Sequence, residues 1–157
     1  MTDGATAIPE VQALLRALAT GRDVAELGAA FGETAALLAE TARSVVTVER
    51  DPERVAVARG RLGGLANVDL LEGDAYEELC GRGPFGLVFV DGGRPHDWEA
   101  ILALVELGGL IVKDDLTPGG AVEGDDVREF LLGDPRLAAA EILATPELAA
   151  IVASRIA

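Results

Sequence analysis

The sequence predicts a doubly wound α/β fold: one mostly parallel, seven-stranded sheet with helices on both faces and an antiparallel hairpin at its C-terminus. Short runs rich in β-branched residues alternate with Ala- and Leu-rich stretches of helical spacing, which is typical of βαβ units on a parallel sheet. The apolar run 85–90 is bounded by turn residues, as in a central strand that is buried on both faces. Two strand-like segments in the tail are separated by only residues 145–147, a connection that can join only antiparallel neighbours.

A leading helix and three strand–helix pairs are expected in the first half of the chain. The leading helix is expected over 8–20, where apolar residues recur at helical spacing, and Gly21 ends it. Asp51 and Pro52 are well suited to the N-cap and first turn of a later helix. The expected strands are 24–27, 44–49 and 68–71, and the expected helices are 33–42, 52–62 and 74–79.

The second half continues the alternation and adds the hairpin. The expected strands are 85–90, 110–112, 139–144 and 148–154, and the expected helices are 97–107 and 122–132. No internal repeat or linker divides the chain. We therefore expect a single domain over 1–157, with an N-terminal helix within 1–21 and a Rossmann-like core over 22–157.

Charge and composition exclude several classes of function. The formal net charge is −14 and no basic stripe is present, so a nucleic acid is not an expected partner. No apolar run reaches the roughly 18 residues that span a membrane, and the first residues lack the segments of a signal peptide. The single cysteine, Cys80, cannot form an internal disulfide. We expect a cytoplasmic protein that binds neither membranes nor nucleic acids.

The turn after the first expected strand combines glycines with a carboxylate. Glu26 stands two residues before Gly28, and Gly32 precedes the following helix. Glycines here let a ligand approach the backbone, and a helix N-terminus offers free N–H groups. The dinucleotide fingerprint G-x-G-x-x-G is not met, since Ala30 stands at its second glycine. A carboxylate at this strand end suits an ammonium group better than a pyrophosphate.

Two further acids follow neighbouring strands. Glu49 comes 21 residues after Gly28, close to the spacing of roughly 20 for a carboxylate that binds ribose hydroxyls. Asp74, followed by Ala75, could accept the exocyclic amine of adenine. Each acid alone is equally well explained as a helix cap or a solvated turn residue. Together, acids at three strand ends of one sheet edge predict a crevice for a nucleoside.

These residues resemble the class I S-adenosylmethionine (SAM)-dependent methyltransferases, and the resemblance covers almost the whole chain. The family's acid and glycine-rich turn are similar to residues 26–32, its ribose acid to Glu49, and its adenine-binding acid to Asp74. The resemblance implies SAM as the cofactor, with further contacts from Gly28, Ala30, Gly32, Ala75 and Asp91. Ala30 departs from the family, which usually has glycine there, and its methyl group narrows the floor of the pocket.

Two acidic turns look most like those of the small-molecule O-methyltransferases related to the caffeoyl-CoA and catechol enzymes. Asp91 lies in the turn 90–93, and Asp114 and Asp115 lie in the turn 113–116. The resemblance implies a divalent cation such as Mg²⁺ on these three carboxylates, which are hard oxygen ligands. The alternative is that Asp91 caps a helix and Lys113 neutralises the Asp pair. Because successive strand residues point to opposite faces, Asp114 and Asp115 can both reach the site only if the strand has already ended.

A hydroxyl that accepts a methyl group must also lose its proton. His96, the single histidine, is one candidate for the catalytic base, and a solvated loop residue is the alternative interpretation. Lys113 is the other candidate, with a structural ion pair as its alternative. Related enzymes use a lysine where this chain has Arg94, which stays protonated. Trp98 is interpreted as a packing residue, and Cys80 as inert.

Three functions stay open on the sequence alone. The first is a SAM-dependent O-methyltransferase that acts on a hydroxyl of a small metabolite. The second is a module that binds SAM, or its demethylated product S-adenosylhomocysteine (SAH), without catalysis. The third is a nicotinamide-dependent oxidoreductase, which the glycine pattern and the short tail disfavour. The expected partner is a small-molecule methyl acceptor, and the resemblance also allows a homodimer in which a second subunit completes the pocket.

Overall fold

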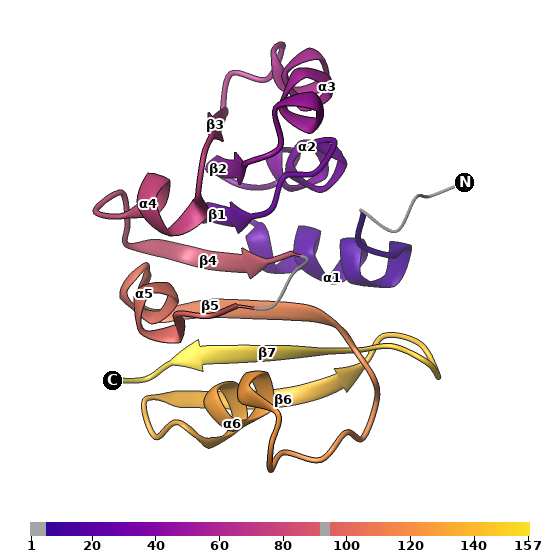
Figure 1. The fold of residues 1–157 in the computed structure, drawn as a ribbon, viewed down its shortest axis with the longest axis vertical. Coiled ribbons are helices and arrows are strands. Elements are labelled where there is room, and N and C mark those ends of the chain that lie inside the picture. Colours follow the sequence, from indigo (N-terminus) through magenta and orange to yellow (C-terminus); the bar gives the residue numbers. More distant parts are fainter. Residues whose placement is uncertain (1–5, 92–94) are drawn as a thin grey trace.

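The fold is built on one seven-stranded sheet. The computed structural model describes residues 6–91 and 95–157, and its strand order is β3-β2-β1-β4-β5-β7-β6 (Figure 1). The strands from β3 to β5 are parallel, and β7 is antiparallel to both β5 and β6. The predicted fold class is confirmed. The strands are β1 (Asp23–Leu27), β2 (Ser44–Glu49), β3 (Val68–Glu72), β4 (Phe85–Val90), β5 (Val105–Leu116), β6 (Leu137–Leu143) and β7 (Ala149–Arg155).

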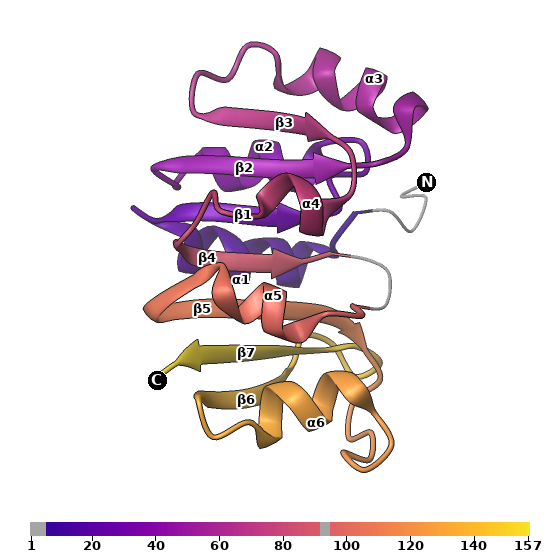
Figure 2. The same cartoon turned by 60° about the vertical axis from the view of Figure 1, so that its left-hand side comes forward.

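Helices cover both faces of the sheet. Figure 2 shows α4, α5 and α6 in front of the sheet and α1 and α2 behind it. Each set closes its own hydrophobic core, and α3 contributes to the core shared with α1 and α2. The helices are α1 (Pro9–Ala19), α2 (Glu33–Ala39), α3 (Pro52–Leu62), α4 (Ala75–Leu79), α5 (Trp98–Ala103) and α6 (Asp126–Gly133). None of the described helices is long and apolar enough to cross a membrane.

Four helices begin at an aspartate whose carboxylate accepts backbone N–H groups of the first turn. These N-caps are Asp51, Asp74, Asp97 and Asp125. Such a cap satisfies donors that have no partner within the helix, and replacing it by alanine typically costs about 1 kcal/mol. The predicted start of α3, with Asp51 as N-cap and Pro52 in the first turn, is confirmed.

Two helix predictions are wrong at one end. The helix expected over 97–107 ends at Ala103, because Val105 pairs with Phe85 and already belongs to β5. β5 is therefore much longer than the predicted strand 110–112. The helix expected from Val122 begins at Asp126, because the left-handed backbone of Gly124 (φ 82°) and the Asp125 cap start it later.

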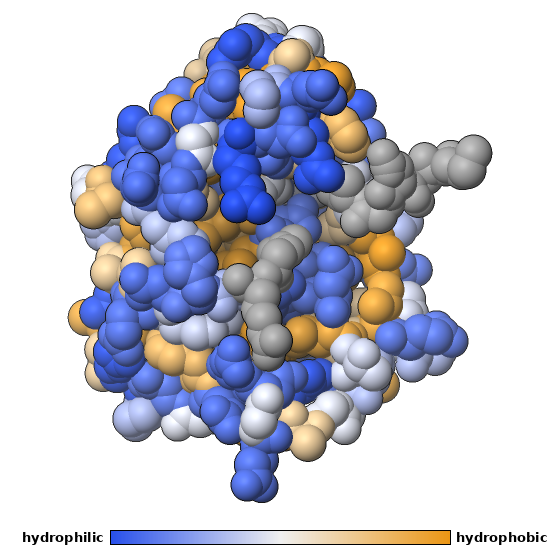
Figure 3. Space-filling model, viewed as in Figure 1, coloured by the Kyte–Doolittle hydropathy of each residue, from blue (hydrophilic) through white to orange (hydrophobic). Residues whose placement is uncertain are grey.

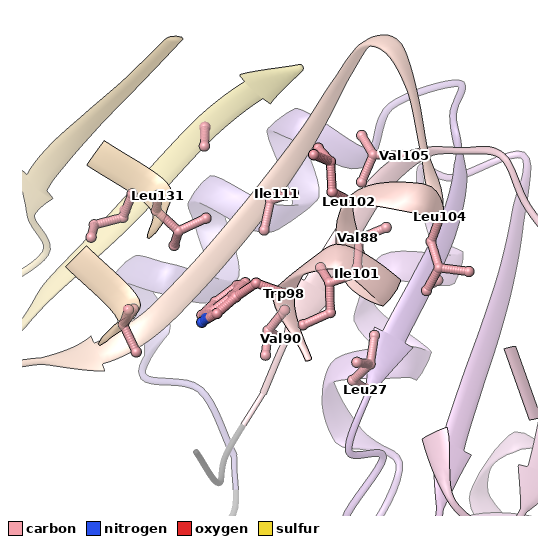
Figure 4. Close-up of a cluster of buried hydrophobic side chains, with 14 of the residues drawn as sticks. Leu27, Val88, Val90, Trp98, Ile101, Leu102, Leu104, Val105, Ile111 and Leu131 are labelled. Carbon is pink, nitrogen blue, oxygen red and sulfur yellow. The ribbon is translucent and has the colours of Figure 1, made fainter. Parts of the chain in front are cut away.

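The core on the α4–α6 face is aliphatic with one large aromatic anchor. Trp98 is 9% exposed, and its ring stacks on Phe130 of α6 with centroids 5.2 Å apart. Figure 4 shows it among Val90, Ile101 and other buried side chains of β4, β5 and α5. The interpretation of Trp98 as a packing residue is confirmed, and its ring joins α5 to α6.

A buried arginine holds the segment between β5 and α6. The side chain of Arg128 is 4% exposed and forms ion pairs with Asp125 (2.6 Å) and Glu141 (2.8 Å). It also donates to the carbonyl oxygen of Thr117. These bonds link α6, β6 and the loop that leaves β5, and so they restrain the chain just after Asp114 and Asp115.

Replacing Arg128 by alanine should destabilise the fold by roughly 3 kcal/mol, because it leaves two carboxylates partly buried without their partner. Chemical denaturation measures the loss. The control is Arg43→Ala, which removes an exposed ion pair to Asp23 and should cost less than about 1 kcal/mol. Equal losses in the two variants would contradict the structural role of Arg128.

Candidate functional site

A cavity of about 320 Å³ opens at the C-terminal ends of the central parallel strands. This is the sheet edge at which open α/β folds bind ligands, and the volume lies at the lower end of the usual range for small-molecule sites. Figure 3 shows a largely hydrophilic face with hydrophobic residues in the recess near its centre. The walls come from the ends of β1, β2 and β4 and from the segments that follow β2, β3 and β4: Leu27, Gly28, Val48, Glu49, Arg50, Arg54, Gly73, Asp74, Ala75, Tyr76, Val90, Asp91, Pro95 and His96.

One residue of the glycine-rich turn lines the cavity, and two others fix the conformation of the turn. Gly28 lines the cavity with φ 102°, and a Cβ on it would lie 2.7 Å from the carbonyl oxygen of Asp91. Gly32 is the N-cap of α2, and a Cβ there would press against Leu62 and Ala58 of α3. Ala30 is buried with φ 45°, an uncommon conformation for a residue with a side chain. Gly28 therefore bounds the cavity, while Gly32 and Ala30 shape the turn beneath it.

Glu49 lies at the end of β2 and lines the cavity. Its Oε2 accepts the N–H of Ala30 at 2.8 Å, and its Oε1 accepts the N–H groups of Arg50 and Asp51, both at 3.0 Å. A carboxylate offers about four acceptor positions. Three backbone donors hold this one in place, and acceptor capacity toward the cavity remains.

Asp74 and Ala75 lie on the wall next to Glu49. Oδ1 of Asp74 accepts the N–H groups of Tyr76 and Glu77 as the N-cap of α4. Within 6–91 and 95–157, Oδ2 has no hydrogen-bond partner. The same aspartate thus serves as a helix cap through one oxygen and presents the other as an acceptor, so the two interpretations of Asp74 are compatible.

Glu26 shares this sheet edge but is fully buried, and it does not line the cavity. It points to the face covered by α1 and α2, where Thr47 donates to its Oε2 at 2.6 Å. No described residue bonds its Oε1. Burial raises the pKa of Glu26 to about 8, the Thr47 bond opposes this shift, and the charges of Asp91 and Asp114 add to it. The carboxyl is therefore protonated at neutral pH when no cation is nearby.

Asp91, Asp114 and Asp115 converge at the ends of β4 and β5. One carboxylate oxygen from each lies within 4.8 Å of the other two. The strand alternation that would separate Asp114 from Asp115 is broken, because Asp115 has φ 58° and the register with β7 shifts between Lys113 and Leu116. Asp and Asn tolerate this left-handed conformation better than most residues. The local bend brings both neighbouring carboxylates to one side.

Asp114 is the buried member of this cluster. It is 1% exposed, and within the described chain its Oδ1 has no hydrogen-bond partner. Burial raises the pKa of Asp114 to about 6, and the charge of Asp115 adds to the effect. Nζ of Lys113 lies 3.9 Å from this Oδ1, so the lysine partly neutralises the cluster, as the alternative interpretation expects. The three carboxylates together are still a favourable ligand set for a hard cation.

The two candidate bases lie in different surroundings. His96 lines the cavity, and its ring lies 4.3 Å from that of Tyr76. The backbone N–H of His96 donates to the Tyr76 hydroxyl at 3.2 Å. Lys113 is buried outside the cavity walls, and its Nζ donates to the carbonyl oxygen of Asp114 at 2.7 Å. The hydrogen bonding of Lys113 is that of a structural residue. Arg94 lies outside the described residues.

Sequence reasoning did not identify several walls of the cavity. Tyr76 follows Ala75 and Arg50 follows Glu49 in the sequence. Adjacency to a residue predicted to bind the cofactor is therefore the one signal that could have identified them. Arg54 lies one helical turn further on, with its guanidinium 5.8 Å from the centre of the Phe31 ring. These arginines place positive charge at one end of a cavity whose other walls carry acids.

Comparison with known proteins identifies the fold. No protein-family model matches the sequence. The chain has a TM-score of 0.79 and 27% identity to cofactor-bound Rv0187 from MTB, covering 97% of this chain and 83% of that one. For the O-methyltransferase from Bacillus cereus in complex with SAH, the TM-score is 0.77 and the sequence identity is 22%, and the match covers 96% of this chain and 83% of that one. The chain has the fold of the class I SAM-dependent methyltransferases.

Curated relatives are methyltransferases with different acceptors. The protein-L-isoaspartate O-methyltransferase of Picosynechococcus sp. is 34% identical over 102 residues, which are 64% of this chain and 46% of that protein. The probable cobalt-precorrin-6B C(15)-methyltransferase (decarboxylating) of Methanothermobacter thermautotrophicus is 37% identical over 125 residues, which are 76% of this chain and 60% of that protein. The chain spans about half the length of the curated relatives it matches.

The buried Glu26 should make stability fall as the pH rises. Its folded pKa lies above the ordinary value, so its carboxyl is uncharged in the folded protein while the unfolded chain is ionised between about pH 4.5 and 8. Stability is therefore greatest below this window and declines through it. Glu26→Gln removes the effect and keeps an acceptor for Thr47.

Urea denaturation in the presence of a chelator, at pH 5 and pH 8, tests this expectation. The stability advantage of Glu26→Gln over the unsubstituted protein should grow by on the order of 3 kcal/mol between these pH values. Glu53→Gln, on an exposed position of α3, should give no such change. A constant difference between Glu26→Gln and the parent protein would show that Glu26 does not titrate abnormally.

Proposed function

We propose that the chain binds SAM in the cavity and is a SAM-dependent methyltransferase that methylates a hydroxyl of a small molecule. The observation that carries the proposal is the arrangement of Gly28, Glu49 and Asp74 around one cavity, at the edge where the fold binds ligands. The O-methyltransferase from Bacillus cereus, which binds SAH, supports the choice of cofactor through its shared fold.

The adenosyl group is recognised by Glu49 and Asp74. Glu49 accepts ribose hydroxyl groups with the acceptor capacity that its three backbone bonds leave. Oδ2 of Asp74 would accept a hydrogen bond from the exocyclic amine of adenine, and Ala75, in the same wall, would contact the adenosyl group. Gly28 lines the cavity and lets the backbone of Asp91 pack closely against the turn. Glu26 lies outside the cavity walls, so it would act on a cationic methionine group through its charge and not by direct contact.

A divalent cation fits the cluster of Asp91, Asp114 and Asp115. The buried Oδ1 of Asp114, which has no hydrogen-bond partner in the described chain, supports this assignment together with two further carboxylates. A bound cation would supply Lewis-acid chemistry and lower the pKa of an acceptor hydroxyl. The carboxylates would hold it beside the cavity, since Asp91 belongs both to the cluster and to the cavity wall.

His96 is the residue placed to take up the proton of the acceptor. It lines the cavity near Asp91, and its ring is held by Tyr76. Lys113 is less well suited, because its Nζ is buried and already donates to a carbonyl oxygen. Positioning of the acceptor in line with the methyl group supplies much of the rate, roughly 7–11 kcal/mol in well-oriented systems.

Two alternatives differ in chemistry. The chain could bind SAM or SAH without transferring the methyl group, and the departure at Arg94 favours this. A nicotinamide-dependent oxidoreductase is disfavoured by the glycine pattern. The curated relatives act on isoaspartyl protein and on a cobalt-precorrin, so the acceptors in a labelled-methyl assay should include an isoaspartyl peptide as well as phenols and catechols. Methyl transfer to any acceptor separates an enzyme from a binding module.

Calorimetric titration should detect binding of SAH and no binding of NAD. Asp74→Asn should weaken SAH binding about tenfold, because it replaces an acceptor by an amide donor while it preserves the helix cap. Asp51→Asn is the matched control, since Asp51 is also an N-cap but lies outside the cavity walls. Binding of NAD instead of SAH would favour the oxidoreductase.

Titration with Mn²⁺, followed by electron paramagnetic resonance, tests the cation site. Asp114→Asn should weaken binding at least tenfold, because a buried charged ligand is lost. Asp115→Asn should bind Mn²⁺ more strongly than Asp114→Asn, since the charge lost at the exposed Asp115 is weakened by solvent whereas the one lost at Asp114 is buried. Asparagine also tolerates the φ of 58° at position 115. Glu106→Gln, at an exposed site on β5, is the control. No saturable binding at millimolar Mn²⁺ would refute the site.

A further inference from the structure

A second hollow lies between α4 and α5, and we name it the α4–α5 groove. It has a volume of about 250 Å³, and its walls are residues 27, 75, 76, 80, 81, 83, 84, 100, 103 and 104. Both helices lie on the same face of the sheet (Figure 2). α4 and α5 are short, spanning 75–79 and 98–103, and residues of both helices lie in the walls. Leu27 and Leu104, at one end of the cluster in Figure 4, form its apolar base.

Among the residues that the structure describes, no charged side chain lines the groove. This is unusual in a chain of net charge −14 in which a quarter of all residues are charged. Tyr76 and Cys80 are the described wall residues whose side chains carry a polar group. Placing an ion against such walls would cost its hydration without a compensating partner. The chemistry of the walls therefore selects an uncharged ligand.

The shape of the groove favours a flat ligand. Several walls are glycine or alanine, among them Gly81, Ala100 and Ala103, and a Cβ on Gly81 would meet no atom within 4 Å. A planar ring can approach such a surface closely and stack on Tyr76. Apolar cavities of roughly 150 Å³ already bind benzene, so the larger groove has room for two fused rings.

We propose that the α4–α5 groove binds an uncharged aromatic molecule of one or two fused rings beside the cofactor. Leu27, Ala75 and Tyr76 belong to the walls of both the groove and the cofactor cavity. The first ligand to bind orders these shared walls, so the second ligand loses less conformational entropy when it binds. The groove ligand and the cofactor should therefore raise each other's affinity by the same factor. This coupling rests on the proposed SAM site, whereas binding in the groove does not.

Indole is the probe, and Cys80 provides a specific signal because it is the only cysteine of the chain. Calorimetry should detect indole binding to the protein alone. Saturating indole should slow the reaction of Cys80 with Ellman's reagent at least threefold, since the thiol lines the groove. Absence of binding up to the solubility limit of indole, or an unchanged reaction rate at saturation, would overturn the proposal.

Ala103→Phe, which fills the groove from α5, should weaken indole binding at least tenfold and abolish protection of Cys80. Ala56→Phe is the matched control at an exposed position of α3 and should bind indole like the parent protein. Circular dichroism checks both folds, and Ala100→Leu is a second filling variant if Ala103→Phe does not fold. Equal affinity for indole in a folded filling variant and in the control would contradict the location.

SAH distinguishes the two proposals. With saturating SAH, indole should bind two- to fivefold more tightly. Displacement of indole by SAH would overturn simultaneous binding and assign the groove to the cofactor site. If SAH does not bind at all, the proposed function fails, while binding of indole to the free protein still decides the nature of the groove.

Discussion

The close approach of β1 to the chain after β4 is the constraint on which the site depends. Any side chain at position 28 would lie 2.7 Å from the carbonyl oxygen of Asp91. The absence of one allows the N–H of Asp91 to donate to Leu27, while the N–H of Gly28 donates to Val48 of β2. Three strand ends are thereby held at one edge. Because these strand ends lie side by side, Glu49, Asp74 and Asp91 surround a single cavity.

The same edge collects carboxylates at an electrostatic cost. Glu26 and Asp114 are buried, and each has an oxygen without a hydrogen-bond partner in the described chain, although Nζ of Lys113 lies 3.9 Å from that of Asp114. Burial is the main reason that the pKa of each is raised. An acid in such surroundings either stays protonated or is stabilised by a positive charge. A sulfonium cofactor with an ammonium group, or a divalent cation, has the complementary charge. The electrostatics of the apo protein thus agree with the proposed ligands.

Local patterns predict the parts of this structure that local forces decide. The strand at 85–90, the cap at Asp51 and the antiparallel hairpin follow from hydrophobic pattern and turn chemistry, and all are observed. The end of α5 does not follow, because Val105 suits either a helix or a strand and its pairing with Phe85 decides between them. The left-handed backbone at Asp115, which unites two carboxylates, depends on the junction of β5 with β7.

The candidate site divides in the same way. Glu49, Asp74 and Asp91 could be predicted because strand ends of a parallel sheet meet at one edge. The orientation of Glu26 toward the opposite face depends on the pleat of β1, and the role of Tyr76 in joining two hollows depends on the packing of α4. Both require tertiary structure, which no local spacing in the sequence contains.

A crystal structure of the protein with SAH tests the central claim most directly. The account predicts electron density for the ligand in the 320 Å³ cavity, with the ribose hydroxyls within hydrogen-bond distance of Glu49 and the adenine amine near Oδ2 of Asp74. Density for SAH elsewhere on the molecule, or a ribose bound away from Glu49, would contradict it.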